Sequence, residues 1–266
     1  MKLFTIFGNP VSHSKSPLLH NAAFKSLDLK HGYVRTYLED GNNLKKCFNA
    51  FAFDGANITV PHKEAAFRAA DEVRGLAKEI GAVNTLVREG DKLIGYNTDC
   101  DGFMQAISGF VGIKNVLVLG AGGTAKAIAL AMRNSGLDVT ILNRSEGRLD
   151  YFKKQAFKCD TWETFKHAQY DLVVNTTSAG LSDENLPIDK DILTRLLQDT
   201  KAAVDAIYGK MTPFLTLADQ LHIPYKDGGD MLVAQAVIAF EHFVATDIPT
   251  IDRNTITAVM QNAIKL

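Results

Sequence analysis

Residues 115–145 read NVLVLGAGGTAKAIALAMRNSGLDVTILNRS, the most informative part of the chain for its architecture. An apolar β-rich run is followed by a glycine turn, an alanine-rich segment and a second β-rich run, an order that predicts a strand, a helix and a parallel strand. Gly120, Gly122 and Ala125 have the Gly-x-Gly-x-x-Ala spacing of a dinucleotide-binding turn, the alternative being a purely structural turn. Gly122 lets the backbone approach a pyrophosphate, whose charge is attracted by the N–H groups at the helix start. The predicted phosphate-binding residues are Gly120, Ala121, Gly122, Gly123 and Thr124.

The end of the second strand indicates which dinucleotide binds. Sites for NAD usually place an acidic residue there, about twenty residues after the glycines, to bind the ribose hydroxyls. This chain instead has Asn143, Arg144 and Ser145, with Arg148 following. A guanidinium presents a planar set of donors that suits a phosphate and can also cover an adenine ring. These four residues therefore predict a site for the ribose 2′-phosphate of NADP, the alternative being a solvated basic helix start.

The composition restricts the class of protein. The chain has 266 residues, of which 46% are hydrophobic and 22% charged, values ordinary for one or two globular domains. The formal net charge is -1, so neither nucleic acid nor an anionic membrane is an expected partner. No apolar run reaches the roughly eighteen residues of a membrane span, and the apolar run at 1–7 ends too early for a signal peptide.

The cysteines and histidines argue against a metal site. Cys47, Cys100 and Cys159 lack Cys-x-x-Cys spacing, and the 7 histidines show no metal-ligand spacing. We therefore expect reduced thiols in the cytoplasm, no disulfide framework and no bound metal.

Strands and helices are predicted to alternate along most of the chain. Strands are expected at 3–7, 33–38, 55–60, 83–88, 93–96, 116–119, 138–142, 171–175, 202–207 and 223–225, with a hairpin turn at 89–92. A helix is expected to follow Ser16 as its N-cap, with Pro17 in the first position and Leu18 on its apolar face. Further helices are expected at 44–53, 63–80 with a break near Gly75, 101–110, 232–244 and 254–264.

The order of these elements predicts an α/β protein with two domains. Residues 1–100 form an α/β substrate domain, which the final helices at about 232–266 complete because no strand separates them. Residues 101–231 form a Rossmann-type, doubly wound domain that binds NADP. Ligands of such sheets bind where the carboxyl ends of the strands open, so we expect the active site in a cleft there.

Polar side chains follow several of the predicted strands. Ser14 and Ser16 can bind a carboxylate or simply cap a helix, and Thr59 lies at the end of the third strand. Lys63 can polarise a carbonyl and donate a proton as hydride arrives, and Asp99 can pair with it. Taken singly, Lys63 is more often a surface lysine and Asp99 more often a helix cap. Together with a nicotinamide-type domain, the catalytic interpretation is favoured.

Motifs along nearly the whole chain resemble those of the shikimate dehydrogenase family. They are Gly8 to Pro17 (GNPVSHSKSP), Ala56 to Lys63 (ANITVPHK), Gly81 to Thr85 (GAVNT), Gly95 to Asp99 (GYNTD), the glycine turn, Asn143 to Ser145 (NRS), Asp227-Gly228 and Met231 to Gln235. The resemblance implies an oxidoreductase that reversibly reduces 3-dehydroshikimate to shikimate with NADPH, in the chorismate route to aromatic amino acids. The chemistry is compatible, since an ammonium stabilises a forming alkoxide and uncharged hydroxyls can orient a carboxylate.

The resemblance also implies residue roles. Ser14, Ser16 and Tyr208 would hold the substrate carboxylate, and Thr59, Asn84, Asp99 and Gln235 would meet its hydroxyl and carbonyl oxygens. Lys63 and Asp99 would form the general acid and base pair. The cofactor would contact Gly120 to Thr124, Asn143 to Arg148, and the backbone at Ala206 and Gly228. A monomer or homodimer is expected.

Two departures and two alternatives accompany this hypothesis. Gly75 stands where relatives generally carry an acidic residue near the nicotinamide, which puts a secondary cofactor contact in doubt. The segment after Tyr208 is one residue shorter than usual, which makes the placing of Ala206 and Tyr208 less secure. One alternative is a quinate/shikimate dehydrogenase of broader substrate or cofactor use. The other is a nucleotide sensor without catalysis, which the presence of both Lys63 and Asp99 disfavours.

Overall fold

The computed structural model describes residues 1–166 and 168–265, and these form two compact units. The first unit combines Met1–Gly102 with Val233–Leu266, and the second is Phe103–Leu232. The chain crosses between the units within two helices, α5 (Asp99–Ile107) and α10 (Gly229–Val244). The boundaries expected from the sequence, next to residues 100 and 232, lie close to these crossings.

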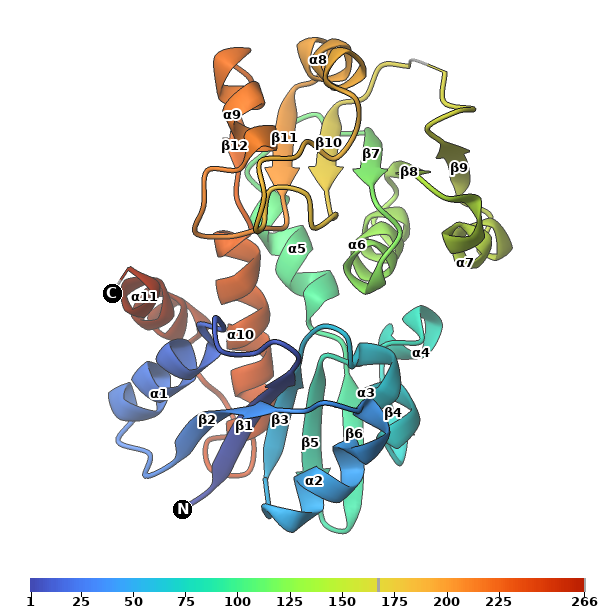
Figure 1. The fold of residues 1–266 in the computed structure, drawn as a ribbon. Coiled ribbons are helices and arrows are strands. Elements are labelled where there is room, and N and C mark those ends of the chain that lie inside the picture. The colour runs from blue at the N-terminus through green and yellow to red at the C-terminus, as the bar shows by residue number, and fades with distance from the viewer. Residues whose placement is uncertain (167, 266) are drawn as a thin grey trace. The chain divides into compact units, whose positions relative to one another are not determined.

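The first unit is built on a mixed sheet of six strands in the order β2-β1-β3-β5-β6-β4 (Figure 1). The strands are β1 (Leu3–Gly8), β2 (Gly32–Tyr37), β3 (Gly55–Ile58), β4 (Glu72–Val73), β5 (Thr85–Glu89) and β6 (Lys92–Tyr96). β1 pairs parallel with β2 and β3, whereas β5 runs antiparallel to both β3 and β6. The amino end of β5 therefore lies between the carboxyl ends of β3 and β6.

Helices cover both faces of this sheet. On one face, α2 (Leu44–Ala50), α3 (Lys63–Ala69) and α4 (Ala77–Ile80) enclose a core that contains Phe7 and Phe48. On the other, α1 (Ser16–Ser26) packs against α11 (Arg253–Ile264), and the rings of Phe4 and Phe243 from α10 lie 4.8 Å apart. A short 3-10 helix, η1 (Gly41–Asn43), precedes α2.

The second unit is a doubly wound parallel sheet in the order β12-β11-β10-β7-β8-β9, as predicted for the nucleotide half (Figure 1). Its strands are β7 (Asn115–Leu119), β8 (Asp138–Asn143), β9 (Lys158–Thr161), β10 (Leu172–Asn175), β11 (Ala202–Asp205) and β12 (Tyr225–Lys226). One face is covered by the core helices α6 (Gly123–Asn134) and α7 (Asp150–Lys154), after η2 (Glu146–Arg148). The other face is covered by α8 (Lys190–Gln198) and α9 (Pro213–Gln220).

Some predicted elements differ from the structure. The expected helix at 63–80 is two short helices separated by β4, and Gly75 has a φ of 61°, a left-handed conformation that favours glycine. The expected helix at 44–53 ends at Ala50, and β9 was not predicted. The N-cap assignment of Ser16 is wrong, because Ser16 is the first residue of α1 and no side chain caps that helix. Leu18, expected on the apolar face, is exposed.

Candidate active site

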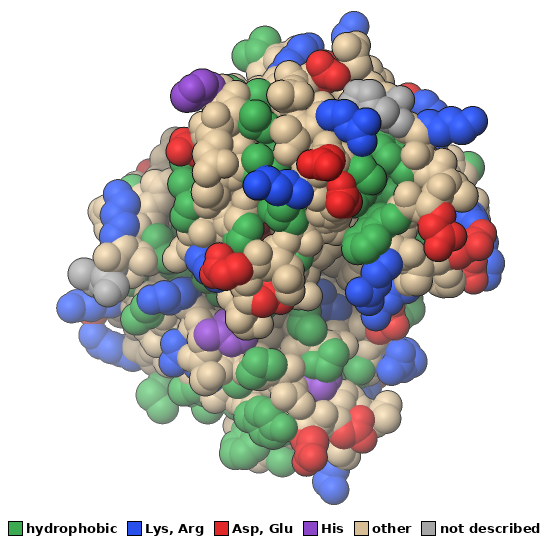
Figure 2. Space-filling model, turned by 45° about the horizontal axis from the view of Figure 1, so that its top comes forward, with side chains coloured by type: hydrophobic (Ala, Val, Ile, Leu, Met, Phe, Trp, Pro, Cys, Tyr) green, Lys and Arg blue, Asp and Glu red, His purple; other side chains and the backbone are tan. Residues whose placement is uncertain are grey.

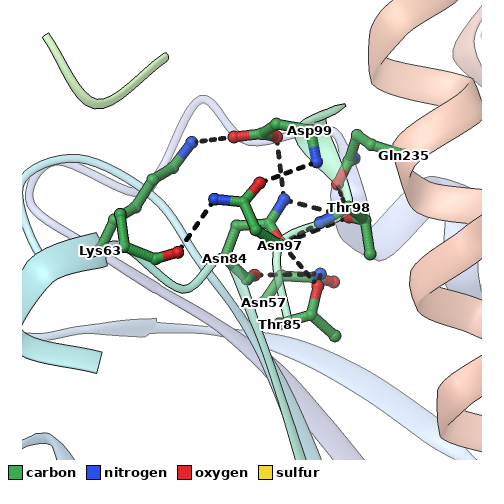
Figure 3. A network of polar contacts seen from close by, with 9 residues as sticks. Asn57, Lys63, Asn84, Thr85, Asn97, Thr98, Asp99 and Gln235 are labelled. Carbon is green, nitrogen blue, oxygen red and sulfur yellow. Dashed lines mark hydrogen bonds and ion pairs between the residues drawn. The ribbon is translucent and has the colours of Figure 1, made fainter. Parts of the chain in front are cut away.

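A mostly buried ion pair lies in the first unit where β3 and β6 end and β5 begins (Figure 3). Lys63 opens α3 soon after β3, and Asp99 opens α5 after β6. Lys63 Nζ lies 2.6 Å from Asp99 Oδ2, and the two side chains are 15% and 8% exposed. A pair this sheltered is screened little by solvent and keeps a fixed geometry, while the lysine retains some access to water. The structure thus brings together the two residues predicted as an acid and base pair.

Asn84 joins this pair to its surroundings. It precedes β5, and its Nδ2 donates to Asp99 Oδ1 at 2.8 Å and to Thr98 Oγ1 at 3.0 Å. Asp99 N–H is in turn held by Asn97 Oδ1 at 3.1 Å. Gln235, from α10, lies beside the network with its Oε1 3.3 Å from Thr98 Oγ1. Four predicted site residues, Lys63, Asn84, Asp99 and Gln235, therefore belong to one polar cluster.

A second group of predicted residues lies at the start of α1. Ser14 and Ser16 are both buried, and Ser14 Oγ donates to Ser16 Oγ at 3.2 Å. Arg35, on β2, donates from Nε and Nη2 to the carbonyl oxygen of Ser14 at 2.9 and 2.6 Å. Two hydroxyls on a turn backed by a guanidinium suit an anionic group such as a carboxylate.

Thr59 follows β3 directly and is half-buried beside the first turn of the chain. A Cβ at Gly8 would lie 2.4 Å from Thr59 Cγ2. Glycine at position 8 is therefore what allows the two strand ends to approach this closely.

The glycine turn of the second unit has the geometry that its spacing predicted. Gly120 has a φ of 105°, and a Cβ there would lie 2.7 Å from Thr176 Oγ1. Gly122 is the N-cap residue of α6, and a Cβ built on it meets nothing within 4 Å. The backbone at Gly122 is thus open to a ligand, and the first N–H groups of α6 lack acceptors within their own helix.

A cavity of about 1110 Å³ in the second unit extends from this turn, a volume adequate for a dinucleotide. Arg144 and Arg148 line it and are exposed, and no carboxylate stands at the end of β8, where Asn143 donates to the carbonyl of Ser145 at 2.8 Å. The lining also includes Trp162, which is 39% exposed. These residues fit a dinucleotide with a phosphorylated ribose better than one with a free 2′-hydroxyl.

The remaining predicted residues lie after the last two strands, Ala206 and Tyr208 after β11 and Gly228 after β12. Asp205 is fully buried; burial raises its pKa, while its Oδ1 accepts from Ile207 N–H at 3.0 Å and its Oδ2 accepts from Thr212 Oγ1 at 2.7 Å. The carboxylate thus ties together both ends of the short segment that contains Tyr208. Close by, a Cβ at Gly228 would lie 2.3 Å from the carbonyl oxygen of Ala206, so these two backbones touch.

The structure separates the predicted site residues into two sets. The first unit holds Ser14, Ser16, Thr59, Lys63, Asn84, Asp99 and Gln235, and the second holds Gly120 to Thr124, Asn143 to Arg148, Ala206, Tyr208 and Gly228. Sequence reasoning assigned no site role to Arg35, Thr98, Asp205 or Trp162, which the structure places in or against these sites. Thr98 is the only one of these that carried a signal, since it adjoins Asp99.

Other kinds of site find no support in the described residues. In residues 1–166 and 168–265, no group of three His, Cys, Asp or Glu side chains is arranged to hold a metal ion. Across the same residues, none of the helices has the length and hydropathy needed to cross a bilayer. On the face shown in Figure 2, Lys and Arg side chains are interspersed with Asp and Glu.

Comparisons with known proteins give a family match in each unit. Residues 6–86 match the family model described as the shikimate dehydrogenase substrate binding domain, and residues 116–214 match the model described as ketopantoate reductase PanE/ApbA. The NADP(+)-dependent shikimate dehydrogenase of Helicobacter hepaticus is 48% identical over 242 residues, which are 90% of each chain.

Solved structures show the same similarity. The crystal structure of shikimate dehydrogenase 1 from Peptoclostridium difficile has a TM-score of 0.85 and 30% identity, and the match covers 100% of this chain and 98% of the other. The shikimate 5-dehydrogenase of Thermus thermophilus, solved in complex with NADP(H) and shikimate, has a TM-score of 0.84 and 33% identity over 99% of this chain and 100% of the other.

Proposed function

We propose that this chain, which belongs to the shikimate dehydrogenase family, catalyses the reversible NADPH-dependent reduction of 3-dehydroshikimate to shikimate. The observation that carries the proposal is the buried Lys63–Asp99 pair, whose Nζ and Oδ2 lie 2.6 Å apart. A nucleotide sensor needs no sheltered proton donor. The pair occurs in a chain whose other unit has a glycine turn and arginines suited to NADP.

The first unit supplies the groups that recognise the substrate. The hydroxyls of Ser14 and Ser16 hold its carboxylate, and being uncharged they leave the charge of Lys63 undiminished. Thr59, Asn84, Asp99 and Gln235, all in the first unit, meet the ring oxygens. Several fixed hydrogen-bonding groups of this kind favour a polyhydroxylated ring acid over an apolar ketone.

Lys63 performs the proton transfer. When bound, NADPH supplies the hydride that reduces the carbonyl carbon. Lys63 donates a proton from its ammonium to the oxygen of that carbonyl, so that the product is a neutral alcohol, and it recovers a proton from water through its exposed fraction of 15%. Asp99 holds the ammonium in place and stabilises its charge. In the direction of shikimate oxidation, Lys63 accepts the proton.

The cofactor is held by the second unit. Gly120 to Thr124 bind its pyrophosphate, and Asn143 to Arg148 bind the 2′-phosphate and adenine. The touching backbones at Ala206 and Gly228 form the nicotinamide end. We place the enzyme in the cytoplasm, where its three cysteines, none of which forms a disulfide, remain reduced.

Steady-state kinetics with purified protein test the function. We expect NADPH formation from shikimate and NADP+, with a much lower kcat/KM when NAD+ replaces NADP+. A comparable kcat/KM for quinate would assign the chain to the broader quinate/shikimate class. NADPH binding without turnover of 3-dehydroshikimate would instead support a sensor.

A further inference from the structure

We infer that Thr85 is a positioning residue of the active site, and that its hydroxyl orients the Asn84 amide so that the amide N–H groups face Asp99. The inference rests on the proposed function, because it assigns a role around the Lys63–Asp99 pair. Thr85 closes the motif Gly81 to Thr85, but no role was assigned to it from the sequence, and it is 0% exposed at the first position of β5. Its position is visible below Asn84 in Figure 3.

The Asn84 side chain has every hydrogen-bonding position occupied. Its Nδ2 donates to Asp99 Oδ1 and Thr98 Oγ1, at 2.8 and 3.0 Å. Its Oδ1 accepts from the backbone N–H of Thr98 at 2.8 Å and from Thr85 Oγ1 at 3.0 Å, and Thr98 Oγ1 lies further away, at 3.3 Å. An amide has two donor hydrogens and two acceptor lone pairs, so this set is complete. Rotation of the amide by half a turn would bring its oxygen against the Asp99 carboxylate and its nitrogen against the Thr98 N–H.

The Thr85 hydroxyl has only one hydrogen, and its neighbours determine where that hydrogen points. Asn57 Nδ2 donates to Thr85 Oγ1 at 3.1 Å, which leaves the hydroxyl hydrogen for Asn84. Asn57 Oδ1 accepts from Tyr33 OH at 2.7 Å, which fixes which end of the Asn57 amide faces Thr85. Burial raises the pKa of Tyr33, so the phenol keeps the hydrogen that it donates.

The donors are therefore arranged in one direction, from Tyr33 through Asn57, Thr85 and Asn84 to Asp99. The first four residues are at most 5% exposed, so water cannot replace a missing partner without entering the core. The chain of contacts follows the sheet register, in which Asn57 on β3 lies directly opposite Thr85 on β5. The arrangement gives the Asp99 carboxylate a preorganised donor on Oδ1 while Lys63 contacts Oδ2.

The test replaces Thr85 by Val, which keeps the shape and removes the hydroxyl. We expect kcat to fall on the order of ten-fold, as for loss of one buried hydrogen bond, with little change in the KM for shikimate. Thr85→Ser restores the hydroxyl and should recover most of the rate. Thr5→Val is the matched control, since Thr5 is equally buried in the same sheet but contacts Val34 and Thr36 instead.

A double replacement separates positioning from general destabilisation. If Thr85 acts through the amide, Thr85→Val should have no further effect on kcat in an Asn84→Ala background. Additive losses in the double variant, or an equal loss in Thr5→Val, would overturn the inference.

A second readout needs no turnover. The side-chain amide protons of Asn84, assigned by their loss in Asn84→Ala, should be protected from solvent exchange in the original protein and exchange faster in Thr85→Val. Unchanged exchange in Thr85→Val overturns the inference whether or not the protein is active. Absence of shikimate oxidation in the original protein, with the exchange difference present, overturns the proposed function and leaves the amide orientation intact.

Discussion

A buried histidine of the first unit, His20, should make the folded protein less stable in mild acid. His20 is fully buried in α1, where its ring stacks on that of Tyr33 with centroids 4.4 Å apart and an interplanar angle of 7°. Burial lowers the pKa of His20 from 6.5 to about 3, an effect that a contact with Asn57 partly offsets. The folded protein therefore keeps this imidazole neutral at pH values where the unfolded chain protonates it.

The sign and size of the effect follow from proton linkage. Above pH 6.5 both states hold a neutral ring, so His20 contributes no pH dependence there. Between pH 6.5 and about 3 the unfolded state binds one more proton, so stability falls as the pH falls, by about 1.4 kcal/mol per pH unit. Between pH 7.5 and pH 5, this single group should lower the free energy of unfolding by about 2 kcal/mol.

Urea denaturation at pH 7.5 and pH 5, followed by circular dichroism, measures this loss. The variant His20→Phe keeps a ring against Tyr33 but cannot titrate, so its stability should fall by about 2 kcal/mol less between the two pH values than that of the original protein. Carboxylates and other histidines contribute equally to both proteins and cancel. An equal loss in His20→Phe and the original protein would refute the reasoning.

Three further outcomes follow from the two binding sites. Lys63→Ala should lower kcat by roughly a hundred- to ten-thousand-fold, with a smaller change in KM. The control Lys45→Ala, which removes an exposed ion pair with Asp71, should leave kcat unchanged. A change in KM alone would make Lys63 a binding residue. Arg144→Ala should weaken NADPH by roughly ten- to hundred-fold and NADH much less, measured as kcat/KM, and equal losses would contradict the phosphate role. Trp162 is the single tryptophan of the sequence and lines the nucleotide cavity. Titration with NADP+ should therefore change the tryptophan fluorescence of the protein and reach saturation. Fluorescence that does not change with NADP+ concentration would place the ligand elsewhere.

The nucleotide half was predictable because its signals are local. An apolar run, three small residues at fixed spacing and an alanine-rich helix lie within 31 consecutive residues, and each reflects a backbone requirement that the structure contains. The strand β9 was missed because it is a half-buried edge strand, Lys-Cys-Asp-Thr, without an apolar pattern. β4 was missed because two residues are too short to show a period, and the surrounding charged sequence is typical of a helix.

The interior of the substrate site was not predictable in the same way. Lys63 and Asp99 stood out because each follows a strand, but Asn57, Thr85 and Tyr33 come from three strands whose alignment no local pattern reveals. Asn57 faces Thr85 only because β5 turns back antiparallel beside β3 with this register. A hydrogen-bonded chain that crosses strands depends on pairing, which requires the folded sheet.

The first unit is built from two stretches of chain that are far apart in the sequence, and this affects how it folds during synthesis. Phe243 of α10 packs against Phe4 of β1, and Phe240 of α10 packs against Phe24 of α1, yet the ribosome makes these two α10 residues only after the whole second unit. At ordinary elongation rates the interval is on the order of ten seconds, time enough for the second unit to fold on its own. Throughout this interval, Phe4 of β1 and Phe24 of α1 lack their ring contacts with α10. The nascent chain is therefore most prone to aggregation between the synthesis of β6 and that of α10, while the second unit is being made.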